Sequence, residues 1–161
     1  MTDSFQTLSL RDSLLDGLTQ VGYLHMTPIQ AATLPDMLSG VDILGQAETG
    51  TGKTAAFALA LLNQIDPTQT HVQSLILCPT RELADQVANE IRRLAQRLAN
   101  TRVVTLCGGR SNRQQLKDLE GACHIVVGTP GRVLQHTKSG SLCLRRTGVV
   151  VLDEADRMLD M

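Results

Sequence analysis

The sequence has 161 residues and a mass of 17.4 kDa, enough for one domain with a sizeable core and too little for two. The net charge of −1 does not indicate a nucleic-acid partner, so any such binding must come from local basic residues and backbone donors. Aromatic residues make up only 2% of the chain, which argues against a platform of stacked aromatic rings that binds single strands.

The cysteines indicate a reducing compartment. They are widely spaced, form no Cys-x-x-Cys pair and lie in or beside apolar runs, as Cys78, Cys107, Cys123 and Cys143. We expect buried, reduced thiols and a cytoplasmic protein. No charged-then-apolar leader opens the chain and no apolar run approaches 18 residues, so neither export nor a membrane span is expected.

The first third of the chain predicts helices and one strand. Leucines recur at helical spacing from Leu14 up to a glycine stop at Gly22. Thr27-Pro28 is a typical helix start, and Pro35 predicts that this segment is split into two short helices. Residues 42–44 form a short apolar stretch that predicts a strand, and residues 55–62 are strong helix formers.

The rest of the chain alternates strands and helices. Apolar strands are predicted at 74–77, 103–106, 125–127 and 149–152, with helices at 81–98, 111–119, after residue 131 and from residue 155. This alternation predicts an α/β fold, a parallel sheet with helices on both faces. Polar motifs follow each predicted strand, so they should gather at the carboxyl edge of the sheet, where such folds bind ligands.

Residues 47–54 read Ala-Glu-Thr-Gly-Thr-Gly-Lys-Thr and predict a phosphate-binding loop at a helix N-terminus. Gly50 and Gly52 would let the backbone curl around phosphates, Lys53 would reach the β and γ phosphates, and the Thr54 hydroxyl would ligate Mg²⁺. The general pattern has glycine where this chain has Ala47. The competing interpretation is a tight turn that happens to contain lysine.

A phosphate loop needs a carboxylate at the end of a second strand to hold Mg²⁺. The strand at 149–152 supplies it, because Asp153 and Glu154 follow directly. Asp153 would hold the metal and Glu154 would orient or deprotonate the attacking water. The alternative is that the acidic residues only cap the next helix.

The order of these motifs resembles the DEAD-box RNA helicases of superfamily 2 across nearly the whole chain. Phe5, Gly22-Tyr23 and Thr27-Pro28-Ile29-Gln30 resemble the adenine-recognition motif of that family, and residues 153–156 spell its name. The resemblance implies that Gln30 bonds the adenine edge, that Phe5 packs near the base and that an alanine may open the phosphate loop. The implied ATP-binding residues are Phe5, Tyr23, Thr27, Gln30, Ala47, Glu48, Thr49, Gly50, Thr51, Gly52, Lys53 and Thr54, with Asp156 coupling motifs to one another.

Three further motifs resemble the segments that grip RNA in this family. Their charges and backbone donors suit phosphate and ribose, which position a strand without reading its sequence. Gly108-Gly109 alone would more simply be an ordinary loop. The residues are Pro79, Thr80, Arg81, Gly108, Gly109, Thr129, Pro130, Gly131 and Arg132. Within the family the chain most resembles a bacterial type associated with 23S ribosomal RNA and the large ribosomal subunit, so a role in ribosome biogenesis is expected.

The resemblance also implies a domain organisation. Residues 1–32 would form the adenine-recognition segment and residues 33–161 an incomplete first RecA-like P-loop NTPase domain, ending inside a helix. A Ser-Ala-Thr strand and a second RecA-like domain with arginine fingers would be missing, leaving unpaired strand edges in the sheet and a chain nearly inactive by itself. The expected function is that of an ATP-dependent RNA helicase using ATP and Mg²⁺. The alternative is a non-catalytic, nucleotide-dependent RNA-binding module; a small-molecule kinase would need a substrate lid that the sequence does not show.

Overall fold

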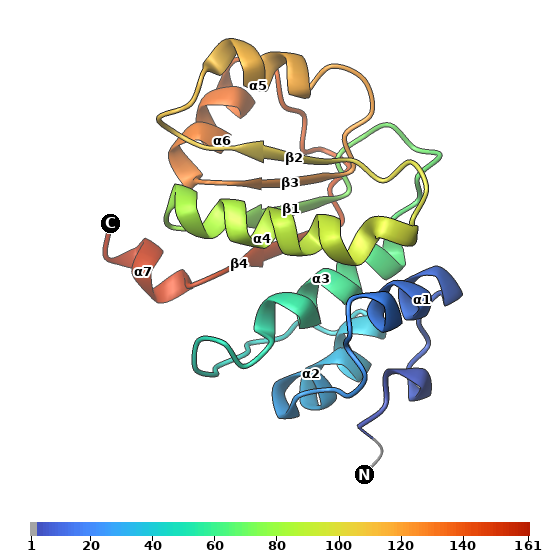
Figure 1. Cartoon of the computed structure of the whole chain (residues 1–161). Coiled ribbons are helices and arrows are strands. Elements are labelled where there is room, and N and C mark those ends of the chain that lie inside the picture. Colours follow the sequence, from blue (N-terminus) through green and yellow to red (C-terminus); the bar gives the residue numbers. More distant parts are fainter. Residues whose placement is uncertain (1–2) are drawn as a thin grey trace. The chain divides into compact units, whose positions relative to one another are not determined.

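The computed structural model describes residues 3–161, and these form two compact units (Figure 1). The first unit comprises the chain up to Gln64 together with Glu90–Ala99. The second comprises Ile65–Asn89 and Asn100–Met161. Helix α4 (Arg81–Leu94) contributes residues to both units. No helix within residues 3–161 is both long and apolar enough to cross a lipid bilayer.

The first unit is helical. A single 3-10 turn at Phe5–Thr7 precedes α1 (Asp12–Gln20), α2 (Pro28–Leu38) and α3 (Lys53–Gln64), and a second 3-10 turn at Ala95–Arg97 follows α4. Gly22 follows α1 with a φ of 82°, a left-handed conformation that stops a helix, as the sequence predicted. The apolar run at the start of α3 is fully buried, so this helix is the centre of the unit.

Pro35 does not split its segment, contrary to our prediction. Helix α2 runs without interruption through Pro35 to Leu38. The missing N–H removes a single hydrogen bond in the last turn, and the burial of Thr33 and Leu34 just before it holds the helix together.

The strand predicted at residues 42–44 is also absent. Residues 41–48 have no regular secondary structure, and Leu44 is 99% exposed. A short segment such as Asp42-Ile43-Leu44 becomes a strand only where a neighbouring strand pairs with its backbone, and the sheet of the described residues does not include it.

The second unit contains a four-stranded sheet in the order β2-β3-β1-β4, with every pairing parallel (Figure 1). The strands are β1 (Ser74–Leu77), β2 (Val103–Leu106), β3 (Ile125–Gly128) and β4 (Val149–Leu152). Helices α5 (Asn112–Asp118), α6 (Pro130–Lys138) and α7 (Ala155–Leu159) follow β2, β3 and β4. The predicted α/β class with a parallel sheet is therefore confirmed.

The two central strands, β1 and β3, are buried on both faces, whereas β2 is half-buried on one face and β4 is the most exposed strand. Leu75, Val104 and Val126 pack on one face with Val133 of α6, whereas the alternating residues Ile76 and Val127 are fully buried on the other. In β4 only one edge pairs with another described strand, and Val150 and Leu152 are more than half exposed.

The cysteines follow the prediction with one exception. All four are free; Cys78, Cys107 and Cys123 are buried, but Cys143 is exposed. Burial, reinforced by the nearby Asp153, raises the pKa of Cys78 to about 12, and burial raises that of Cys123 to about 11. These two thiols are therefore protonated and unreactive at neutral pH.

Candidate functional site

The phosphate loop lies in the first unit, directly before α3. Gly50 and Gly52 have φ angles of 83° and 93°, which bend the backbone in a way that L-residues resist. The Thr51 hydroxyl donates to the Glu48 carbonyl over 2.7 Å, and the Lys53 ammonium donates to the Ala47 carbonyl. The loop thus closes on itself at the helix N-terminus, where backbone N–H groups and the helix dipole favour phosphate.

Gln30 fastens the predicted adenine segment to this loop. Its side-chain oxygen accepts the Thr27 N–H at 2.9 Å and its side-chain nitrogen donates to the Gly52 carbonyl at 3.1 Å. A Cβ on Gly52 would lie 2.5 Å from that nitrogen, so only glycine leaves room for the contact. Because one partner is a donor and the other an acceptor, the orientation of the carboxamide is defined.

Thr27 supplies a polar atom with no partner. Its hydroxyl oxygen is buried and makes no hydrogen bond within the described chain. It also lies 3.0 Å from the position of a Cβ on Gly52, so it borders the phosphate loop. Buried hydroxyls are normally hydrogen-bonded, and an unpartnered one beside a glycine-lined loop suits a site for a polar ligand.

The two aromatic residues of the predicted nucleotide site have different surroundings. Phe5 is 3% exposed and belongs to the apolar core of the first unit. The Tyr23 hydroxyl donates to Glu90 at 2.6 Å, and the Arg93 guanidinium lies 5.2 Å from the centre of the tyrosine ring. Burial, reinforced by Glu90, raises the pKa of Tyr23. Tyr23 therefore links the end of α1 to α4 within this unit.

In the second unit, two of the three predicted RNA-contacting motifs begin helices. The Thr80 hydroxyl accepts the Leu83 N–H over 3.2 Å and caps α4. Thr129 precedes α6, with Pro130 at its first position, and the Thr129 N–H donates to the Leu106 carbonyl at 3.0 Å. Both motifs thus follow strand ends, as predicted.

The third motif, Gly108-Gly109, is a turn held by buried side chains. Gln115 of α5 is 2% exposed and donates to the Cys107 carbonyl at 2.8 Å. The side-chain oxygen of Gln115 lies 3.4 Å from Nε2 of His136, whose Nδ1 lies 2.8 Å from the Ser141 hydroxyl. Burial lowers the pKa of His136, so its imidazole is neutral at pH 7. This chain of polar groups ties the turn to α5 and α6.

The structure brings these motifs together around a groove of about 530 Å³ in the second unit. Gly108 lies on its wall together with the whole Thr129–Arg132 motif and Pro79. The remaining lining residues come from α6 and from the end of the chain. The lining is Pro79, Gly108, Thr129, Pro130, Gly131, Arg132, Gln135, Met158 and Met161.

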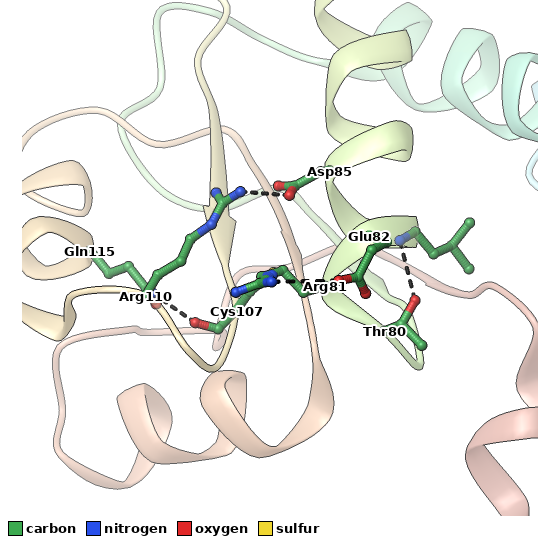
Figure 2. Close-up of polar contacts among 8 residues, drawn as sticks. Thr80, Arg81, Glu82, Asp85, Cys107, Arg110 and Gln115 are labelled. Carbon is green, nitrogen blue, oxygen red and sulfur yellow. Dashed lines mark hydrogen bonds and ion pairs between the residues drawn. The ribbon is translucent and has the colours of Figure 1, made fainter.

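Sequence reasoning missed Arg110, which directly follows Gly109 on the turn whose Gly108 lines the groove. Its guanidinium makes an ion pair with Asp85 (Figure 2). Its carbonyl accepts a hydrogen bond from Arg132. The available signal was its position, because it directly follows a glycine pair at a strand end, as Arg81 and Arg132 follow strand ends elsewhere. Gln115 and His136 were missed as well, since a buried polar residue within a helix carries no signal in the sequence.

The acidic motif follows β4 in a strained conformation. The Asp153 N–H donates to the Leu77 carbonyl at 2.9 Å, which continues the sheet by one residue. Glu154 then adopts a left-handed conformation with φ and ψ both 51°, and its carboxylate accepts from Arg157 at 2.6 Å. A non-glycine residue in this region costs of the order of 1–3 kcal/mol, and such residues cluster at functional sites. Asp156 is exposed in the first turn of α7.

The predicted metal ligands Thr54 and Asp153 belong to different units. Within residues 3–161, no cluster of three or more histidine, cysteine or carboxylate side chains could hold a metal by itself. The Mg²⁺ ligands Thr54 and Asp153 stay a prediction.

Comparison with known proteins decides the family. A family model described as DEAD/DEAH box helicase matches residues 27–161. The chain belongs to this family. All the motifs described above except Phe5 and Gly22-Tyr23 fall within the matched range, and residues 153–156 read Asp-Glu-Ala-Asp.

Relatives of this DEAD/DEAH box helicase chain include curated bacterial proteins. It is 55% identical over 159 residues to the ATP-dependent RNA helicase DbpA of Escherichia coli, covering 98% of this chain and 35% of that protein. It is 47% identical over 163 residues to the ATP-dependent RNA helicase DeaD of Haemophilus influenzae, covering 100% of this chain and 27% of that protein. The chain thus spans about a third of the length of these relatives.

Solved structures give the same answer for the fold. A DEAD box protein from Methanococcus jannaschii superposes with a TM-score of 0.92 at 40% identity, covering 98% of this chain and 43% of that one. Dbp5 from Saccharomyces cerevisiae, bound to RNA and ADP BeF3, superposes with a TM-score of 0.89 at 31% identity, covering 99% of this chain and 40% of the Dbp5 chain. The resemblance to DEAD-box helicases and the RecA-like fold are therefore confirmed, whereas the roles of individual site residues stay predictions.

Proposed function

We propose that this chain is the ATP-binding and RNA-binding part of an ATP-dependent RNA helicase. Residues 1–32 act as the adenine-recognition segment and residues 33–161 as part of the first RecA-like domain, with a second RecA-like domain outside the chain. The names of the relatives support the activity, but the chain covers only about a third of their length, so unwinding by a whole protein is part of the proposal.

The observation that carries the nucleotide assignment is the hydrogen bond from Gln30 to the Gly52 carbonyl. The bond joins the proposed adenine-reading residue to the loop proposed to hold phosphates. A carboxamide offers two donor hydrogens and two acceptor oxygen lone pairs, and Gln30 uses one of each internally. One donor and one acceptor remain, the pair that the edge of adenine requires.

The remaining residues of the proposed nucleotide site act on the triphosphate and its metal ion. Lys53 exchanges its contact with the Ala47 carbonyl for the β and γ phosphates. Thr54 and Asp153 are the residues that would ligate Mg²⁺, and the bound metal would neutralise charge on the phosphate oxygens. Glu154 orients the attacking water, and the left-handed backbone at this residue fixes where its carboxylate can reach.

RNA is the proposed partner of the groove in the second unit. Arg132 lines the groove, and Arg81 lies beside Gly109, on the turn whose Gly108 also lines it. Threonine hydroxyls and backbone N–H groups add neutral donors to phosphate and ribose. The scarcity of aromatic residues favours contacts to the backbone over stacking on bases. The structural relationship to a Dbp5 complex with RNA supports this partner. Ribosomal RNA as the target and ribosome biogenesis as the process are proposed from the resemblance of the motifs alone.

The four free cysteines support a cytoplasmic location.

The test is a thermal melt of the chain with Mg-ATP or Mg-GTP. A ligand that binds only the folded state stabilises it, by about 2.7 kcal/mol at a hundred times its dissociation constant. ATP should raise the midpoint and GTP should not. Gln30→Ala should abolish the preference for ATP, whereas the exposed Gln96→Ala should retain it. Equal shifts with both nucleotides would refute adenine recognition.

Turnover separates the helicase from the non-catalytic alternative. RNA-stimulated ATP hydrolysis by a longer protein containing this chain, lost in Glu154→Gln, supports the helicase. ATP binding without turnover in such a protein would instead support a nucleotide-dependent RNA-binding module.

A further inference from the structure

The guanidinium of Arg110 is held in place by an ion pair with Asp85. One terminal nitrogen of its guanidinium lies 2.5 Å from Oδ2 of Asp85, on the first half of α4, and Figure 2 shows the two side chains pointing toward each other. The side chain of Arg110 is still 45% exposed. A guanidinium carries five donor hydrogens, so this ion pair leaves several of them available to a ligand.

The backbone beneath Arg110 is anchored as well. Its carbonyl accepts from Arg132 at 3.3 Å, and the carbonyl of Cys107, at the start of the same turn, accepts from Gln115 at 2.8 Å. Both donors come from helices of the second unit. Arg110 therefore projects from a fixed base, so that little conformational entropy remains to be lost when it binds something.

A second arginine lies on the same turn. Nη1 of Arg81 is 3.1 Å from where a Cβ on Gly109 would sit, and Gly109 has a φ of 73°, so the turn needs glycine there. Nη2 of Arg81 lies 3.5 Å from Oε1 of Glu82, whose side chain is 70% exposed. Counting Arg81, Arg110 and Arg132 against Glu82 and Asp85, three positive charges minus two negative charges leave a net charge of +1 around the turn.

We propose that Arg110 is a further RNA-binding residue, which contacts a phosphate of the strand, and that Asp85 positions it. The inference rests on the proposed RNA partner of the groove in the second unit. Arg110 does not line that groove, but it follows the Gly108-Gly109 turn, of which Gly108 does. An arginine held by one nitrogen can present its other donors to two oxygens of one phosphate. Because a phosphate contact reads no base, the contribution of Arg110 should not depend on the RNA sequence.

The test must distinguish a direct contact between Arg110 and RNA from an indirect effect, in which Arg110 only neutralises the charge of Asp85. In Arg110→Gln alone, an unpaired Asp85 would repel RNA whether or not Arg110 touches it. The comparison is therefore Asp85→Asn against Asp85→Asn/Arg110→Gln, because residue 85 is neutral in both. The matched control is Asp85→Asn/Arg145→Gln, which removes an exposed arginine of the same charge just ahead of β4, at the opposite end of the strands.

Binding of the chain to fluorescein-labelled oligouridylate and oligoadenylate is measured by anisotropy between about 50 and 200 mM salt. Removing Arg110 in the Asp85→Asn background should weaken binding about fivefold to both oligomers and reduce the slope of log K against log salt by about 0.7. Removing Arg145 should change neither. Equal effects of the two removals would overturn the proposal.

Two more variants keep the outcome interpretable. Arg110→Lys in the same background keeps the charge and should restore the salt slope while recovering only part of the affinity, because lysine lacks the planar fork. A thermal melt of each variant checks that it is folded. If Arg81→Gln weakens binding and the removal of Arg110 does not, this inference alone fails. If neither matters, the proposed RNA surface fails with it.

Discussion

Gly52→Ala tests whether the contact between Gln30 and the phosphate loop organises the nucleotide site. The new Cβ would meet the side-chain nitrogen of Gln30 at 2.5 Å, at a backbone φ of 93°. The left-handed backbone costs an alanine about 1–2 kcal/mol, and displacing Gln30 forfeits a hydrogen bond worth about 1 kcal/mol. The free energy of unfolding should therefore fall by about 2–3 kcal/mol, measured by urea unfolding.

The control and the second background separate the two costs. Gly45→Ala places its Cβ in open space in the same segment and should change the free energy of unfolding by less than about 0.5 kcal/mol. In a Gln30→Ala background the obstructing side chain is gone, so Gly52→Ala should cost about 1 kcal/mol less than in the original chain. An equal cost in both backgrounds would show that Gln30 does not contact the loop in solution, and the reasoning would be refuted.

Three further predictions concern the second unit. Because burial lowers the pKa of His136 from its usual 6.5, the unfolded chain binds that proton more readily than the folded chain. The free energy of unfolding should therefore fall as pH drops below about 6.5 toward the lowered pKa, and His136→Asn should reduce this fall. Gln115→Ala leaves a buried carbonyl unpaired and should cost about 1–3 kcal/mol in urea unfolding, against a few tenths for its exposed neighbour in Gln114→Ala. Only Cys143 should react rapidly with a thiol reagent in the folded chain, and Cys143→Ser should abolish that fast phase.

The strands of the sheet could be predicted from the sequence almost residue by residue. Ser74–Leu77, Val103–Leu106 and Val149–Leu152 match the predicted ranges because each is an apolar run that ends at a polar motif. Residues 42–44 have the same local pattern and form no strand. A strand depends on a neighbour for its hydrogen bonds, and a local pattern cannot show whether that neighbour is present.

The candidate site was predictable in its motifs and not in its cross-links. Helix starts at Thr27, Thr80 and Thr129 follow from capping rules. The ion pair between Arg110 and Asp85 joins residues 25 positions apart, and only the folded chain brings them together. Likewise, the left-handed backbone at Glu154 contradicts the ordinary preference of glutamate, so a rule based on residue type could only miss it.

These cross-links bear on how nucleotide and RNA sites can be built from so few specialised residues. Gln30 is uncharged and only 4% exposed. Its carboxamide caps α2 through the Thr27 N–H and binds the Gly52 carbonyl of the phosphate loop, and it still has one donor hydrogen and one acceptor lone pair. If adenine takes those two remaining groups, base recognition leaves the bond to Gly52 in place and adds to it. Occupation of the base site should then stabilise the loop that holds the phosphates. ATP should accordingly protect the backbone amides of residues 50–54 from hydrogen exchange more strongly than inorganic triphosphate does, and Gln30→Ala should remove the difference.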